Sequence, residues 1–373
     1  MTFCIITHVI HTEQEGKYYA YAPYVREMNI WTKQVDKVIL LAPKIKSDIT
    51  PLDLGYNHDN IEFIAIDSFD ILSLKAIFRT FLKVPGISWQ IFKAMNKADH
   101  IHLRCPGNIG LLGSLVQMLF PNKIKTAKYA GNWDPKSKQP WSYRLQQRIL
   151  NNTFFTRNVQ VLVYGQWGGI SKNIKPFFTA TYAEKDKTSL LSLNTKENIH
   201  FVFVGTLSRG KNPLYVLQMV EALLKKGVEA TLSFYGEGIE RNLLEDYIVK
   251  NQLEKSVTMK GNQTQETIME AYQNSHFVIL PSLSEGWPKA VAEAMFWGCL
   301  PLATPVSCVP WMLDYGNRGL LLEMDLKRDV LKIEALLQSQ DSFDNMRKSA
   351  SGWSRVYTLD VFEEEIEKLV VSK

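Results

Sequence analysis

The sequence predicts an α/β protein built from two doubly wound domains. Short apolar runs with strand composition alternate with amphipathic stretches of helical length, and this rhythm is typical of right-handed βαβ units and parallel sheets. The chain has 373 residues, enough for two domains of about 150 residues each. With 46% hydrophobic and 22% charged residues, the composition is globular and excludes a disordered, collagen-like or coiled-coil chain.

In the first half, each apolar run predicts a strand, although the alternation with helices is less regular there. These runs lie at residues 3–7, 37–41, 61–66, 100–104 and 124–129. Between two of them, residues 69–97 mix apolar side chains with lysines and one arginine. That pattern predicts a basic amphipathic helix, which either lies on an anionic membrane or packs on the sheet.

The second half gives the clearer alternation. Strands are predicted at 200–204, 230–235, 256–260, 276–280 and 300–304, with helices between them. Asn212-Pro213 indicates a helix start, and Pro288 and Gly298 bound another helix at its first turn and just past its end.

The stretch 182–198 is polar and rich in Lys, Ser and Asn, so we expect the linker there. The predicted domains are therefore residues 1–190 and 191–354. A last helix, within about 355–373, is expected to pack back on the first domain.

Charge is distributed unevenly along the chain. Residues 1–195 carry 24 Lys and Arg against 14 Asp and Glu, whereas the remainder carries 19 against 24. A basic half indicates an acidic partner, either nucleic acid or an anionic membrane surface, or simply a solvated basic face. No helix-turn-helix, zinc or ribonucleoprotein signature is present, so no nucleic-acid partner is expected.

The cysteines and the hydropathy predict a cytoplasmic protein, peripheral at the inner face of the membrane if the basic half binds lipid. The four cysteines form no C-x-x-C pair, which suits a reducing compartment. The first residues lack a basic leader and a cleavage site. The longest uncharged run, 105–122, holds Pro106 and several polar residues, so no transmembrane helix is expected.

The loop 205–211 has the composition of a phosphate site. It follows a predicted strand and precedes a helix, its two glycines allow close approach of an anion, and Arg209 and Lys211 add positive charge. An ordinary basic surface loop would have the same composition.

Two glutamates flank a second predicted helix start, after the strand at 276–280. Glu285 lies in the entry loop and Glu293 within the helix. The eight-residue separation rises about 12 Å, which matches the reach from a sugar across a diphosphate to a ribose. A carboxylate can accept hydrogen bonds from vicinal hydroxyls at either end. Alternatively, both glutamates are helix-surface acids.

The segment from Glu285 to Glu293, followed by Ala294-Met295, Gly298, Pro301 and Thr304-Pro305, closely resembles the E-x7-E signature of the retaining, nucleotide-sugar-dependent glycosyltransferase family 4. Residues 203–211 resemble that family's phosphate loop, and 235–238 its next glycine turn. The resemblance implies the GT-B fold, in which two doubly wound Rossmann-like domains face a central cleft.

The resemblance also implies roles for individual residues. Glu285 would contact the donor sugar, and Lys211, with Arg209 nearby, would neutralise the leaving diphosphate; these three are the catalytic candidates. Glu293 would hold the ribose hydroxyls. The implied donor-binding residues are Gly205, Thr206, Gly236, Glu237, Gly261, Asn262, Gly286, Trp287, Lys289, Ala290 and Glu293.

Two positions depart from the family pattern. Thr206 stands where the family usually has Arg, and Ala130 stands where it often has a sugar-contacting His, with Asn132 or Asp134 as the nearest polar replacements. The acceptor-side candidates are His11, Gly16, His102, Arg104, Asn132 and Asp134. For the histidines and Arg104, a structural role stays the alternative.

The sequence therefore predicts a retaining glycosyltransferase that moves a sugar from a nucleotide diphosphate sugar to a glycan or lipid-linked acceptor in surface polysaccharide synthesis. No cofactor and no metal are expected, since there is no D-x-D motif. The alternatives are a GT-B-fold nucleotide-sugar epimerase and a catalytically dead GT-B scaffold in a glycan-assembly complex.

Overall fold

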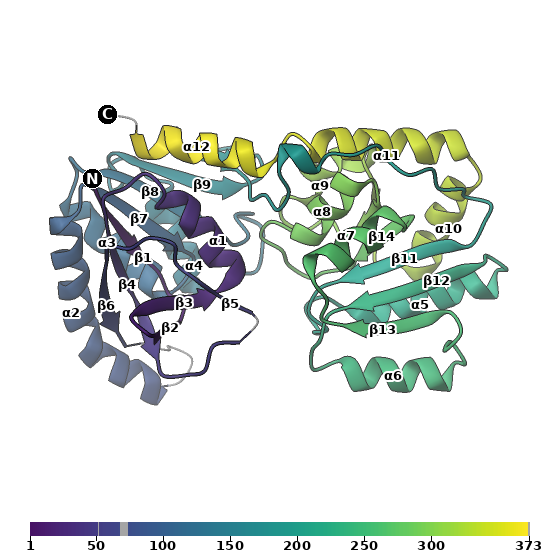
Figure 1. The fold of residues 1–373 in the computed structure, drawn as a ribbon, viewed down its shortest axis with the longest axis horizontal. Helices are drawn as coiled ribbons and strands as arrows, with labels where there is room; N and C mark the ends of the chain where they lie inside the picture. The colour runs from purple at the N-terminus through teal and green to yellow at the C-terminus, as the bar shows by residue number, and fades with distance from the viewer. Residues whose placement is uncertain (51, 68–73, 372–373) are drawn as a thin grey trace. The chain divides into compact units, whose positions relative to one another are not determined.

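The computed structural model describes residues 1–50, 52–67 and 74–371 (Figure 1). The chain forms two compact units: residues 1–178 together with the chain from Phe362 onward, and residues 179–361. Each unit is a parallel sheet covered by helices, so the predicted α/β class and the two Rossmann-like halves are confirmed.

Seven parallel strands form the main sheet of the first unit, in the order β10-β9-β8-β7-β1-β4-β6. Because β1 lies between β4 and β7, the direction of winding reverses at the boundary of β1 and β7. A small antiparallel extension, β2-β3-β5, joins the end of β4. The strands are β1 (Thr2–Ile6), β2 (His11–Gln14), β3 (Lys17–Tyr21), β4 (Lys37–Ile45), β5 (Asp53–Gly55), β6 (Ile61–Ile66), β7 (His100–Cys105), β8 (Ile124–Tyr129), β9 (Val159–Tyr164) and β10 (Ile174–Phe177).

The helices of the first unit connect these strands: α1 (Ala22–Trp31), α2 (Leu74–Lys97), α3 (Asn108–Val116) and α4 (Trp141–Leu150). The basic amphipathic helix predicted at 69–97 corresponds to α2, and its residues 69–73 lie outside the described residues. In the described part, Ile87, Ile91 and Met95 are buried in the core beside β1 and β7. This part of the helix therefore packs on the sheet.

All six strands of the second unit are parallel, in the order β13-β12-β11-β14-β15-β16. Numbered within the unit this order is 3-2-1-4-5-6, the doubly wound arrangement, and its winding reverses between β11 and β14. Figure 1 shows α8 and α11 on one side of the strands and α6 on the other. The strands are β11 (Ile199–Val204), β12 (Ala230–Tyr235), β13 (Val257–Gly261), β14 (Phe277–Leu280), β15 (Leu300–Ala303) and β16 (Leu320–Leu321). The helices are α5 (Pro213–Lys225), α6 (Arg241–Lys250), α7 (Gln265–Gln273), α8 (Lys289–Trp297), α9 (Val309–Met312), α10 (Leu326–Leu337) and α11 (Gln340–Ser354).

The stretch predicted as a linker belongs to the second unit and packs against it. The first unit therefore ends at Phe178 rather than at residue 190. Tyr182 packs on Phe296 and Trp297 with ring centroids 5.0 Å apart in both cases. Further along, Arg347 donates a hydrogen bond to the Leu191 carbonyl at 3.1 Å. These contacts are long-range, and the polar composition of the stretch gives no sign of them.

The last helix, α12 (Leu359–Val371), joins the first unit from Phe362 onward. The Phe362 ring contacts Phe177 and Phe178 at centroid distances of 5.5 and 5.6 Å. Lys128, completely buried, donates to the Phe178 carbonyl at 2.7 Å and lies 5.6 Å from the Phe362 ring. One buried cation therefore holds the end of the first unit's chain and the returning helix together.

Across the described ranges, no helix combines the length and the apolar character that a membrane crossing requires. All four cysteines are buried as thiols.

Candidate functional site

Two loops meet where the winding of the second unit reverses, after β11 and after β14. The Leu283 amide donates to the Gly210 carbonyl at 2.8 Å, so the loops share a backbone hydrogen bond. Beside it, Lys211 Nζ donates to Glu285 Oε1 at 2.5 Å. The lysine side chain is 29% exposed and the glutamate 8%. Ligands of doubly wound sheets bind at this edge and at this reversal, and here a charged pair reaches it from both loops.

Three glycines, Gly205, Gly236 and Gly261, lie at the ends of neighbouring strands and expose their backbone. The Gly205 amide donates to the Tyr235 carbonyl, and the Gly236 amide donates to the Gly261 carbonyl, each at 2.9 Å. All three glycines have positive φ angles, of 152°, 143° and 67°. A Cβ on Gly236 would lie 2.0 Å from the Gly205 carbonyl oxygen. Only glycine fits there, so the ends of β11, β12 and β13 present backbone rather than side chains to a ligand.

Helix α8 begins at the same edge. Its N-cap is Pro288 and its C-cap is Gly298 in the left-handed conformation, which agrees with the predicted bounds. The first amides of a helix have no acceptor within it and carry partial positive charge, and Ala290 lies in this first turn. The entry loop is held from behind, since Ser307 Oγ donates to the Gly286 carbonyl at 3.2 Å. The edge therefore combines an ammonium with a helix N-terminus, which suits an anion.

Glu293 lies further along α8, half-buried among polar side chains. Its Oε1 accepts a hydrogen bond from Thr181 Oγ1 at 2.7 Å. Burial raises the pKa of the Tyr182 and Tyr272 hydroxyls, and the Glu293 carboxylate raises both further. The glutamate already accepts from one hydroxyl here, which is the chemistry that a ribose diol would offer it.

The structure separates other predicted donor-site residues from the Lys211–Glu285 pair. Arg209 is 89% exposed and donates to Glu240 at 3.3 Å. The Trp287 ring packs in an aromatic cluster with Trp353, at a centroid distance of 6.2 Å. Glu237 pairs with Arg241 of α6. Of the remaining predicted residues, Thr206 and Asn262 are exposed on their loops, and Lys289 is half-buried at the first position of α8.

In the first unit, the winding reverses between β1 and β7, and Arg104 near the end of β7 lies there. Its Nη1 donates to Glu27 Oε1 of α1 at 2.7 Å, with the side chains only 11% and 6% exposed. His8 follows β1, and a Cβ on Gly107 would lie 2.8 Å from its Nδ1. Desolvation and the Arg104 charge lower the pKa of His8, so its ring is neutral at pH 7.

His8 and Glu27 were not among the predicted site residues. For His8 a signal existed, because it directly follows the strand predicted at 3–7, at the carboxyl end where ligands of such sheets bind. For Glu27 there was none.

The two predicted acceptor-side histidines are core residues. His11 is completely buried in β2, and its ring nitrogens bond the Val9 carbonyl at 2.8 Å and the Tyr56 hydroxyl at 2.9 Å. His102 is completely buried in β7 with Nδ1 bonded to Thr126 Oγ1 at 2.9 Å. Burial lowers the pKa of His11 to about 4 and that of His102 well below its ordinary value. Both rings are therefore neutral and enclosed.

The other acceptor-side candidates lie in turns. Gly16 forms the β2–β3 turn with φ of 75°. The Ala130 amide donates to the Cys105 carbonyl at 2.7 Å. Asn132 Oδ1 accepts from the Asp134 amide at 2.9 Å, and Asp134 Oδ1 accepts from the Lys136 amide at 2.8 Å. The side chains of Asn132 and Asp134 thus stabilise their own turn.

Comparison with known proteins gives a family match for the second unit. Residues 186–353 match the family described as "Glycosyl transferases group 1". An uncharacterized glycosyltransferase of Haemophilus influenzae is 27% identical over 173 residues, which cover 45% of this chain and 48% of the relative. Protein CapJ of Staphylococcus aureus is 21% identical over 365 residues, which cover 92% of this chain and 89% of CapJ. The matches to the first three curated relatives span 23%, 48% and 42% of their lengths.

A solved structure shares the fold over the whole chain. The Anabaena protein HepE in complex with UDP and glucose superposes with a TM-score of 0.67 at 13% identity, covering 100% of this chain and 99% of HepE. Since that identity is low, the likeness concerns the fold, which is the GT-B arrangement of two Rossmann-like halves.

Proposed function

We propose that this chain, whose residues 186–353 form a glycosyl transferases group 1 domain within a GT-B fold, is a retaining glycosyltransferase of glycosyltransferase family 4. In this proposal it transfers a sugar from a nucleotide diphosphate sugar to a glycan or lipid-linked acceptor. The observation that carries the proposal is the Lys211–Glu285 pair, which bridges the two loops where the winding of the sheet reverses. A cation and a carboxylate at that point suit a diphosphate and a sugar ring, respectively.

The proposed chemistry centres on the leaving group. Negative charge accumulates on the diphosphate as its bond to the sugar breaks, and fixed positive charge lowers the barrier to that step. Lys211 would supply the full charge, and the first turn of α8 would add its dipole. Glu285 would orient the sugar by accepting from its hydroxyls. In a retaining transfer the acceptor attacks the same face of the sugar that the diphosphate leaves.

The relatives support the proposed acceptor and biological role. The name of CapJ and the bacterial relatives favour surface polysaccharide synthesis, and a glycan or lipid-linked acceptor fits that role. HepE is named with UDP and glucose, so UDP-hexoses are the first donors to test. Arg104 and His8, where the winding of the first unit reverses, are the proposed acceptor-side groups.

Glu293 gives a direct test of nucleotide binding. If its carboxylate accepts from the ribose diol, Glu293→Ala should weaken binding of the matching nucleoside diphosphate by about 1–3 kcal/mol, the cost of losing charged hydrogen bonds. Isothermal titration calorimetry with UDP, GDP and ADP measures this.

The matched control is Glu270→Ala, which removes an exposed acid from the same unit and should leave affinity unchanged. Equal affinity of the Glu293 variant and the parent, with the variant folded, would contradict the assignment.

A further inference from the structure

The first unit contains a cavity of about 830 Å³ that lies away from the point where its winding reverses. Its lining includes Lys125 at the start of β8, Asn158 just before β9 and Asn173 just before β10. Since these strands are parallel, their starts share one edge of the sheet. Arg104 lies at the opposite, carboxyl edge, where doubly wound sheets bind their substrates. We call this cavity the amino-edge pocket.

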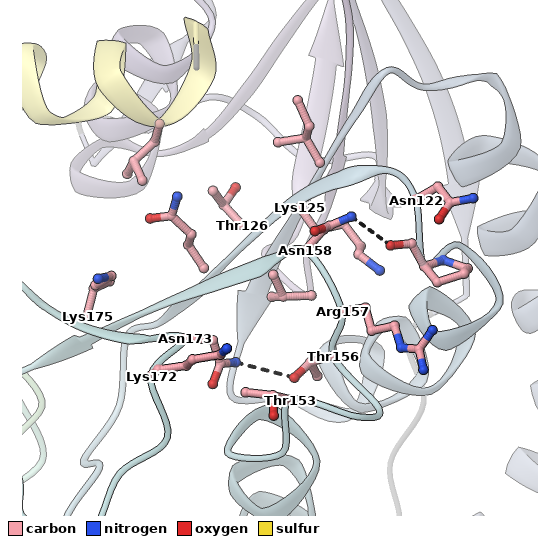
Figure 2. A pocket seen from close by; sticks show the side chains of 15 residues that line it. Asn122, Lys125, Thr126, Thr153, Thr156, Arg157, Asn158, Lys172, Asn173 and Lys175 are labelled. Carbon is pink, nitrogen blue, oxygen red and sulfur yellow. Dashed lines mark hydrogen bonds between the residues drawn. The ribbon is translucent and has the colours of Figure 1, made fainter. Parts of the chain in front are cut away.

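The amino-edge pocket is strongly basic. Four cations line it, Lys125, Arg157, Lys172 and Lys175, and none of its 15 lining residues is acidic. Within the described ranges, none of the four pairs with a carboxylate. Figure 2 shows Lys172 and Lys175 on one side and Arg157 on the other. Three other labelled side chains donate within the protein, Asn158 to the Pro121 carbonyl, Asn173 to the Leu150 carbonyl and Thr156 to the Asn152 carbonyl. The remaining labelled side chains are amides and hydroxyls: Asn122, Thr126 and Thr153.

One of these cations is buried at considerable cost. Lys125 is 1% exposed, and its Nζ donates only to neutral oxygens, the Phe120 carbonyl at 2.7 Å and the Gln117 carbonyl at 3.2 Å. Burial lowers the pKa of Lys125 to about 8. A buried ammonium without an anionic partner is unfavourable, and an anion in the pocket would offset that cost.

We propose that the amino-edge pocket binds a phosphate-bearing anion, either a soluble phosphate ester or the headgroup of an anionic phospholipid. Guanidinium and ammonium donors around one cavity match the acceptor oxygens of a phosphate. The volume lies in the range of small-molecule sites, about 300–1,000 Å³. The pocket is lined by first-unit residues only, so the proposal does not depend on glycosyl transfer.

The surface beside the pocket explains why a phospholipid is one of the two sources. The loop that carries Thr153 and Thr156 also carries Phe154, 70% exposed, and Phe155, 47% exposed. The Arg157 guanidinium lies 5.4 Å from the centre of the Phe154 ring. Exposed aromatic rings next to cations are typical of surfaces that insert into the interface of an anionic bilayer.

The test compares two variants of the full chain with the same loss of charge. The pocket variant carries Arg157→Gln, Lys172→Gln and Lys175→Gln. The control variant carries Lys250→Gln, Lys255→Gln and Lys348→Gln, at exposed positions of the second unit. Lys125 is left intact because its removal from the core could unfold the unit.

Each source of phosphate has its own measurement. Inorganic pyrophosphate is the soluble probe, and hydrogen exchange resolved by peptide separates the amino-edge pocket from the diphosphate loops of the second unit. We expect pyrophosphate to slow exchange in residues 151–160 and 171–176 of the parent and the control, but not of the pocket variant. For lipid, flotation measures binding to vesicles of equal parts phosphatidylglycerol and phosphatidylcholine. The pocket variant should bind them with up to about 100-fold lower affinity than the parent and the control, at about 1 kcal/mol per charge removed.

Loss of protection alone identifies a soluble ligand, and loss of flotation alone identifies a phospholipid headgroup. Both results support the pocket. The proposal is overturned if the pocket and control variants behave alike in both measurements.

Discussion

Lys211→Ala is expected to reduce kcat by about 100- to 1,000-fold, the usual effect of removing one preorganised group that stabilises transition-state charge. Lys211 is the cation paired with Glu285 at the reversal point of the sheet. Because the charge on the diphosphate develops as the bond breaks, the loss should appear in kcat more than in KM. Steady-state kinetics with saturating donor measures the split.

The neighbouring arginine supplies the matched control. Arg209 is 89% exposed and turned toward Glu240. Arg209→Ala should therefore change the activation free energy by no more than about 0.5 kcal/mol, the usual limit for the effect of a surface substitution. Lys211→Arg, which keeps the charge, should recover part of the rate. If Arg209→Ala is as damaging as Lys211→Ala, the diphosphate binds elsewhere on the loop.

Arg104→Met is expected to destabilise the first unit by about 3–5 kcal/mol, the cost of removing one member of a buried ion pair. Glu27 would then be a carboxylate 6% exposed, without the guanidinium 2.7 Å away. Native-state hydrogen exchange of peptides from α1 and β7, in the full chain, reports the opening free energy of this region.

The double variant Arg104→Met with Glu27→Leu separates the pair from simple packing. Removing both charges is often neutral or stabilising, so the double variant should regain most of the lost protection. A double variant as unstable as Arg104→Met alone would mean that the arginine contributes through its packing against Tyr24, 5.5 Å from the ring centre, and not through its charge.

The sequence predicted the bounds of several elements correctly. Strands β6, β8 and β12 have the predicted bounds, and α8 ends before Gly298 as expected. The hairpin of β2 and β3 was not predicted, because its strands have only four and five residues and its turn residue Gly16 stands beside no second strong turn former. Strands β9 and β10 were also not predicted. No helix lies between these two strands, so the alternation of strand and helix that identified the others is absent there.

The sequence singled out Lys211 and Glu285 as candidates, but it did not predict that they form an ion pair. Glu285 and Glu293 were identified from their spacing and setting. That Lys211 bonds Glu285, 74 residues away, and Arg104 bonds Glu27, 77 residues away, depends on strand order, which a single sequence does not encode locally. Arg209 shows the opposite limit. It was grouped with Lys211 by proximity in the chain, and only the geometry of the loop turns it toward solvent.

The most direct test of the central claim is transfer itself. Radiolabelled UDP-, GDP- and ADP-sugars are incubated with the chain and a bacterial membrane extract as the source of acceptors. The account predicts that label from at least one donor enters the lipid-linked or polymeric fraction, that nucleoside diphosphate is released only with acceptor, and that Lys211→Ala abolishes both. Isomerisation of the donor without acceptor would instead identify an epimerase. Binding of donors without any turnover would identify a scaffold, and either result would contradict the account.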